Sequence, residues 1–94
     1  MAFDSERRVH RSTDVVHRVI EAEAVLLDLK SSRYFGLNAT GTAVWEALGT
    51  DGATVAEISM VVGKRFDVAA EVLHRDIVDL LVALEREGLI RQET

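Results

Sequence analysis

The hydrophobic pattern of this chain changes its period once, at Asn38, and that change limits the folds available to it. Before Asn38, apolar residues alternate with other residues over 15–20, 23–30 and 33–37, as on a strand with one buried face. After Asn38, apolar residues recur every three or four positions, as on the buried face of a helix. The sequence therefore predicts three strands followed by helices.

The three predicted strands follow one another closely enough to form an antiparallel sheet. The two faces of the first strand are Val15, His17, Val19 and Val16, Arg18, Ile20, and those of the second are Val25, Leu27, Leu29 and Leu26, Asp28, Lys30. The segment "KSSR" joins the second strand to the third, "RYFGL". Because Ser-Ser is a poor two-residue hairpin turn, we expect a somewhat longer loop there.

Capping residues divide the remainder into three helices. Asn38 is a favoured N-cap for the first helix, and Gly49 ends it. Thr54 and Glu57 have the spacing of a capping box at the start of the second. We expect Asp67 to cap the third helix, which ends at Gly88, and "LIRQ" to close as a short tail against the sheet.

These elements predict an α+β, winged-helix-like domain, with an N-terminal three-stranded antiparallel sheet followed by three helices. We place the domain at residues 14–92 and expect polar, aperiodic residues 1–13 to form a flexible arm. The chain has 94 residues, no cysteine and no apolar run that could span a membrane, so we expect a soluble protein of the cytoplasm. Its net charge of −5 disfavours binding to nucleic acid.

The sequence contains no convincing catalytic or metal-binding pattern. The spacing of His10, His17 and His74 matches no metal signature, and "GLNATG" lacks the residues of a phosphate loop. Asp76 and Asp79 share a helical face, where solvation explains them better than catalysis. Trp45 is expected in the core, although a role in stacking against a ligand stays open. We therefore expect no enzyme activity, cofactor or metal.

One edge of the sheet and one helix together indicate a binding groove. Arg75, Val78, Val82 and Arg86 form a partly apolar ridge beside the predicted core stripe of the third helix. The alternative interpretation of this ridge is a helix buried over a wide arc. If "RYFGL" is a sheet edge, its unpaired backbone groups can accept a peptide as an added strand.

The segments "VLLDLKSSRYFGLNATGTAVWEAL", "RFDV" and "DIVDLLVALEREGLI" resemble the PqqD-like family, over roughly residues 15–91. Members are recognition elements that bind the leader of a ribosomally synthesised, post-translationally modified precursor peptide. The resemblance implies a non-catalytic adaptor that presents the precursor to a modifying enzyme, which could be a radical enzyme, a leader protease with a lasso cyclase, or another modifier. Relatives often have Gly in the second hairpin turn, where this chain has Ser31 and Ser32.

The resemblance also implies where the leader binds: antiparallel to the third strand, in the cleft between that strand and the third helix. The implied strand residues are Arg33, Tyr34, Phe35, Gly36 and Leu37. The helix residues, chosen from the ridge, are Arg75, Val78, Asp79 and Val82. A homodimer is also possible, because an open edge strand can pair with its own copy.

The main alternative function is that of a winged-helix DNA-binding domain. Residues 54–87 carry four Lys/Arg against seven Asp/Glu, a net of −3, which disfavours this alternative. A small hydrolase using Ser59 or a carboxylate pair has almost no support.

Overall fold

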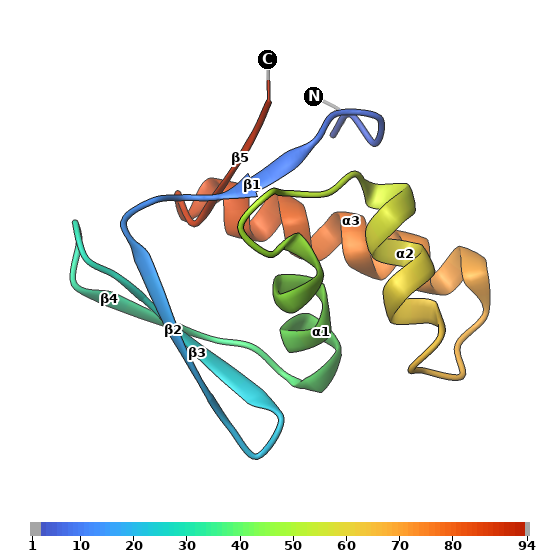
Figure 1. Ribbon diagram of the computed structural model, residues 1–94, viewed down its shortest axis with the longest axis horizontal. Helices are drawn as coiled ribbons and strands as arrows, with labels where there is room; N and C mark the ends of the chain where they lie inside the picture. Colours follow the sequence, from blue (N-terminus) through green and yellow to red (C-terminus); the bar gives the residue numbers. More distant parts are fainter. Residues whose placement is uncertain (1–2, 94) are drawn as a thin grey trace.

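The computed structural model describes residues 3–93, which form an α+β domain (Figure 1). The elements are β1 (Val9–Arg11), β2 (Val15–Ile20), β3 (Glu23–Asp28), β4 (Arg33–Gly36), α1 (Ala39–Leu48), α2 (Val55–Gly63), α3 (Ala70–Arg86) and β5 (Ile90–Gln92). The predicted three-stranded antiparallel sheet and three helices are confirmed. None of the described helices is long and apolar enough to cross a membrane.

The three-stranded sheet has the order β2-β3-β4, so that both β2 and β4 are edge strands. A two-residue turn, Glu21 and Ala22, joins β2 to β3, and both residues have positive φ. Four residues, 29–32, join β3 to β4, which confirms the longer loop. All three helices lie on one side of this sheet (Figure 1). Ala24 and Leu26 of β3 are buried on that side, where α1 packs.

A second, two-stranded sheet joins the two ends of the described chain. β1 pairs antiparallel with β5, with His10 opposite Arg91. Val9 is fully buried in the core, and the β1 backbone also bonds to Ala53. The expectation of a flexible arm over residues 1–13 is therefore wrong for β1, because this strand pairs with β5 at the other end of the described chain. Residues 1 and 2 lie outside the described part.

Side chains cap the first two helices as the sequence predicts. Asn38 Oδ1 accepts the Gly41 N–H at 2.8 Å, and Thr54 and Glu57 form a complete capping box. Gly49 and Gly88 both have positive φ after helix ends. Asp67 is not the N-cap of α3: the N-cap is Ala69, without a side-chain hydrogen bond, because 64–69 form a connection that delays the helix.

The core lies between the helices and the inner face of the sheet. Trp45 is fully buried, which confirms its expected place, and its ring lies edge-on to His17 with centroids 6.2 Å apart. Thr42 is the buried polar residue among those described. Its Oγ1 accepts the Ala24 N–H at 2.8 Å, which ties α1 to β3.

Candidate functional site

The outer edge of β4 presents free backbone hydrogen-bonding groups. In an antiparallel ladder, the backbone N–H and C=O groups of every second residue bond to the neighbouring strand. The N–H and C=O groups of the residues between them point away from that strand. The Leu37 N–H donates to Ala24 O at 2.8 Å, and Leu37 follows β4 in the same register. The alternation therefore directs the N–H and C=O groups of Tyr34 and Gly36 to the open edge. Tyr34 is 72% exposed, and a Cβ at Gly36 would meet nothing within 4 Å.

Helix α3 faces this edge and is joined to it by an ion pair. Arg33 begins β4 and Glu87 is the C-cap of α3, and their Nη1 and Oε1 atoms lie 3.1 Å apart. A small hollow at this point is lined by Arg33, Tyr34, Phe35 and Glu87, among others. The cleft between strand and helix is therefore closed at this end by a charged contact.

A larger hollow of about 310 Å³ lies between the start of α1, which follows β4, and the middle of α3. Its walls are the start of α1, with Asn38 and Thr40, and the middle of α3. Asp76, Asp79 and Leu80 supply the helix wall, so the two carboxylates do share one face. The cleft thus combines an open strand edge, an apolar Leu80 and two acidic groups.

The structure brings only part of the predicted peptide-binding set to the cleft. Arg33, Tyr34 and Phe35 line the small hollow, Gly36 lies on the open edge, and Asp79 lines the larger hollow. Leu37 is 6% exposed and belongs to the core, so its side chain does not face the edge.

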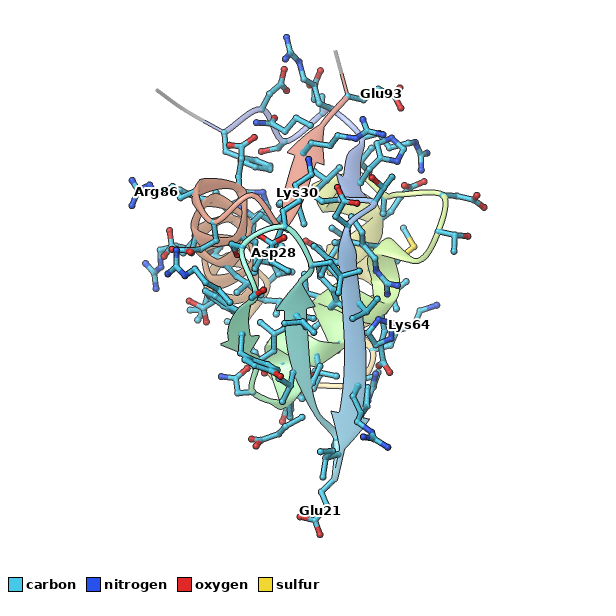
Figure 2. The ribbon with its side chains drawn as sticks, turned by 90° about the vertical axis from the view of Figure 1, so that its left-hand side faces the viewer. Glu21, Asp28, Lys30, Lys64, Arg86 and Glu93 are labelled. Atoms are coloured by element: carbon cyan, nitrogen blue, oxygen red, sulfur yellow. The ribbon has the colours of Figure 1, made fainter. Side chains whose placement is uncertain are left out.

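The ridge residues Arg75, Val78 and Val82 line neither of these two hollows, and their contact with a leader stays a prediction. Val78 packs against the core from the same flank of α3 as His74, which faces α2. Arg86, labelled in Figure 2, also points away from the sheet. Val78 and Leu80 therefore lie on opposite flanks of the buried stripe of α3.

Several residues that line the two hollows are outside the set predicted from the sequence, among them Asn38 and Thr40 on the α1 side, and Asp76, Leu80 and Glu87 on the helix side. The sequence predicts Asn38 only as a helix cap. Asp76, Leu80 and Glu87 recur at four and seven residues, a spacing that does place them on one flank of the helix. Nothing in that spacing indicates which flank the strand approaches.

Hydrogen bonds order the loop before β4. The Lys30 backbone N–H and the Ser31 hydroxyl donate to the Asp28 carboxylate at 3.0 Å each, and they lower the pKa of Asp28. Ser32 in this loop has φ 62°. The loop is therefore fixed by a carboxylate that stays ionised, although it lacks the glycine that the resemblance suggests.

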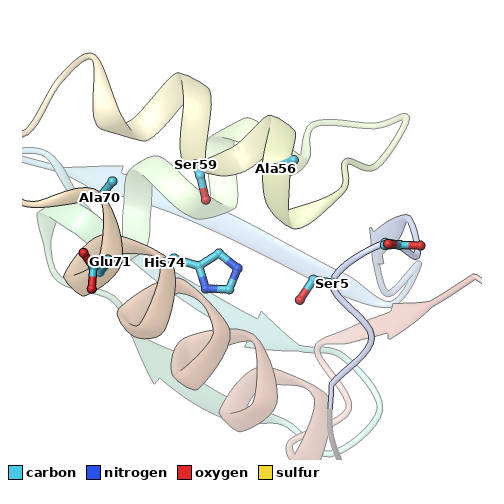
Figure 3. A pocket seen from close by; sticks show the side chains of 7 residues that line it. Ser5, Ala56, Ser59, Ala70, Glu71 and His74 are labelled. Carbon is cyan, nitrogen blue, oxygen red and sulfur yellow. The ribbon is translucent and has the colours of Figure 1, made fainter.

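A third hollow, of about 600 Å³, lies elsewhere, between α2, α3 and the N-terminal segment (Figure 3). Ser59 and His74 project into it from facing helices. The Ser59 hydroxyl oxygen is buried and has no hydrogen-bond partner within residues 3–93, so it does not form an activated Ser–His pair. Among the same residues, no three His, Asp or Glu side chains gather as a metal site.

The fold and the cleft define a class: a small α+β domain with an open strand edge facing a helix. The chain belongs to the PqqD family, because the family model described as Coenzyme PQQ synthesis protein D matches residues 23–90. No curated protein matches the sequence.

Solved structures agree with this assignment. TbiB1 in complex with the TbiA(beta) leader peptide is 33% identical, with a TM-score of 0.81 over 90% of this chain and 98% of that one. Lasso peptide synthetase B1 complexed with the leader peptide is 24% identical, with a TM-score of 0.76 over 89% and 98%. The PqqD truncation of Methylobacterium extorquens PqqCD, a RiPP recognition element, is 24% identical, with a TM-score of 0.77 over 96% and 95%. The last two structures, each 24% identical to this chain, show that the chain shares their fold.

Proposed function

We propose that this chain binds the leader segment of a ribosomally made precursor peptide and delivers the precursor to a modifying enzyme. The leader adds to β4 as an antiparallel strand, and the domain performs no catalysis itself. The observation that carries the proposal is the open edge of β4, with outward Tyr34 and Gly36, beside α3. TbiB1 was solved with a leader peptide, which supports the proposal.

Backbone hydrogen bonds supply part of the affinity. The two outward residues offer two N–H and two C=O groups, each worth about 0.5 to 1.5 kcal/mol when bonded. One or two buried leader side chains then bring the dissociation constant to about micromolar. Such an edge accepts many sequences, so the side chains around it must select the leader.

The selecting side chains lie at the two ends of the cleft. Arg33, Tyr34 and Phe35 contact the leader near Glu87, and Asp79 with Leu80 contacts it near Asn38. Leu37 is buried and supports the strand from the core, whereas contact of the leader with Arg75, Val78 and Val82 stays a prediction. Because Asp76 and Asp79 make the larger hollow acidic, a leader with an acidic residue at that point binds poorly.

The same acidic wall opposes the alternative function of DNA binding. Asp76, Asp79 and Glu87 lie along the helix that a winged-helix protein would place in the major groove. Precursors made by ribosomes are available in the cytoplasm, where we place the domain. Its enzyme partner is a radical enzyme or a leader protease with a lasso cyclase.

Removal of one edge donor tests strand addition. Gly36→Pro removes the outward N–H of residue 36 but breaks no hydrogen bond between β4 and β3. It should weaken leader binding about tenfold or more. The affinity is measured by calorimetric titration with the precursor encoded beside this gene. Gly36→Ala keeps the N–H and adds a methyl group into open space, so it should bind as the wild type does.

A proline on the other edge is the matched control. Asp14 O accepts the Leu29 N–H, so the alternation directs the Val19 N–H outward from β2. Val19→Pro should therefore keep leader affinity, and circular dichroism should show both proline variants folded. If the wild type does not bind the leader, or if Gly36→Pro binds it as tightly, the proposal is wrong.

A further inference from the structure

The outer face of the three-stranded sheet carries a cross-strand row of apolar side chains. Val16 lies opposite Leu27, and Leu27 lies opposite Tyr34, so the row crosses all three strands. Ile20 and Val25 extend the apolar surface toward the β2–β3 turn. Figure 2 views the sheet from this side. Val16 is 48% exposed and Ile20 57%.

This face lacks a cover within the described chain. The three helices lie on the opposite side of the sheet (Figure 1). The outward side chains line a shallow hollow of about 380 Å³ over β2, β3 and β4. An antiparallel sheet with one solvated face normally alternates apolar and polar residues, whereas here both faces are largely apolar. Exposed apolar surface of this kind marks a protein interaction site.

The apolar row is continuous with the proposed leader site. Tyr34 belongs to both, because its side chain lies on the outer face and its backbone groups point to the open edge. A leader strand added to β4 becomes a fourth strand of the same sheet. Every second leader side chain then projects from the outer face, beside Tyr34 and Gly36. The loaded domain therefore presents a wider face than the free domain.

The charge on this face distinguishes between possible occupants. Arg18 lies in its middle, opposite Val25, and forms no salt bridge with residues 3–93. If a second copy docked through the same face, the acidic residue that β2–β4 would present there is Glu23, which lies at the turn end of the face, opposite Ile20. A partner with an acidic side chain inside an apolar patch is the better complement.

We propose that the outer face of β2–β4 docks the modifying enzyme, and that the bound leader strand completes the docking surface. This inference rests on the proposed function. The enzyme contributes apolar side chains against Val16, Leu27 and Tyr34 and a carboxylate against Arg18. Because the leader adds side chains to the same face, the enzyme binds the loaded domain more tightly than the free one, and it meets the precursor as it docks.

Three purified proteins test the inference: this chain, its precursor and the modifying enzyme encoded beside its gene. Enzyme affinity is measured by biolayer interferometry with and without saturating precursor, and leader affinity is measured separately by calorimetry. The precursor should tighten enzyme binding about fivefold or more. Val16→Asp and Arg18→Glu should each weaken enzyme binding about tenfold or more and leave leader affinity unchanged.

Val61→Asp on α2 is the matched control, since Val61 is 50% exposed and lies away from the sheet. It should bind both partners normally. The inference is overturned if Val16→Asp and Arg18→Glu bind the enzyme like the wild type, or if precursor leaves enzyme affinity unchanged. The inference is also overturned if the wild type sediments as a dimer and Val16→Asp sediments as a monomer, because a second copy of the chain would then occupy the face. Failure of the wild type to bind precursor is a different result, which contradicts the proposed function itself.

Discussion

Arg33 and Glu87 bridge the cleft between β4 and α3, with Nη1 and Oε1 3.1 Å apart, although the two residues are 54 positions apart in the chain. Their side chains are 71% and 34% exposed, so solvent screens the attraction. The bridge can therefore hold the empty cleft in shape and still separate at low cost when a peptide strand enters.

A double-mutant cycle with Arg33→Gln and Glu87→Gln should give a coupling energy below about 1 kcal/mol in urea unfolding. Leu84→Ala, at a fully buried position of the same helix, should cost about 2 to 5 kcal/mol and serves as the reference for a core contact. A coupling energy as large as that reference would mean that the bridge locks the cleft.

Thr42→Val should destabilise the domain by about 1 to 3 kcal/mol, because the buried Ala24 N–H loses its acceptor while the side-chain volume is kept. Thr50→Val, at an exposed loop position, should change stability by less than about 0.5 kcal/mol. Denaturant unfolding of both variants measures the difference. Equal effects would show that the Thr42 hydroxyl is dispensable.

Ala22→Gly should stabilise the domain by up to about 1 kcal/mol. Ala22 has φ 69° in the β2–β3 turn, where the Cβ of an L-residue is strained and glycine is not. The same change on the exposed surface of α2, Ala56→Gly, should destabilise by about 0.5 to 1 kcal/mol. Thermal melting that gives both variants the same sign would contradict the strained turn.

Acid should destabilise the domain through two carboxylates. The Lys30 N–H and the Ser31 hydroxyl lower the pKa of Asp28, and the hydrogen bond with the His10 ring, 2.7 Å long, lowers the pKa of Glu93. A depressed carboxyl pKa contributes stability above the unfolded-state pKa, and this stability is lost as the pH falls through the folded-state pKa. Both losses therefore fall below about pH 4.

Melting temperatures between about pH 6 and 3 measure these losses. Asp28→Asn and Glu93→Gln should each flatten the acid part of the profile. Asp51→Asn is the control, since that exposed carboxylate forms no hydrogen bond or salt bridge within residues 3–93, and it should leave the profile unchanged. A Glu93→Gln profile identical to the wild type would exclude the His10 contact as a source of acid sensitivity.

Local patterns were sufficient for much of the fold. The alternation over 15–37 predicts the three-stranded sheet, and the side chains of Asn38, Thr54 and Glu57 cap the helices as their types and spacing indicate. These features depend on hydrogen bonds between residues close in the chain. The open edge of β4 follows from the same reasoning, since "RYFGL" is the last strand of the predicted sheet.

Features that depend on distant contacts were not predictable in this way. β1 contains one apolar residue, Val9, and its identity as a strand depends on β5 at the other end of the chain. Helix α3 has two candidate sides for the peptide, the ridge with Val78 and Val82 and the wall with Asp79 and Leu80. Helical periodicity does not indicate which of these two sides lies beside the strand. Only the packing of α3 beside β4 decides between them.

The pairing of β1 with β5 brings the two ends of the described chain together, with the Glu93 N–H donating to Arg8 O at 2.8 Å. Both ends emerge on the side opposite the β2–β3 turn (Figures 1 and 2). Neighbouring termini make a domain easy to insert into a loop of another protein. The domain could accordingly be transplanted as a cassette into an unrelated enzyme, with its peptide-accepting edge still exposed, to direct that enzyme to any substrate fused behind the leader.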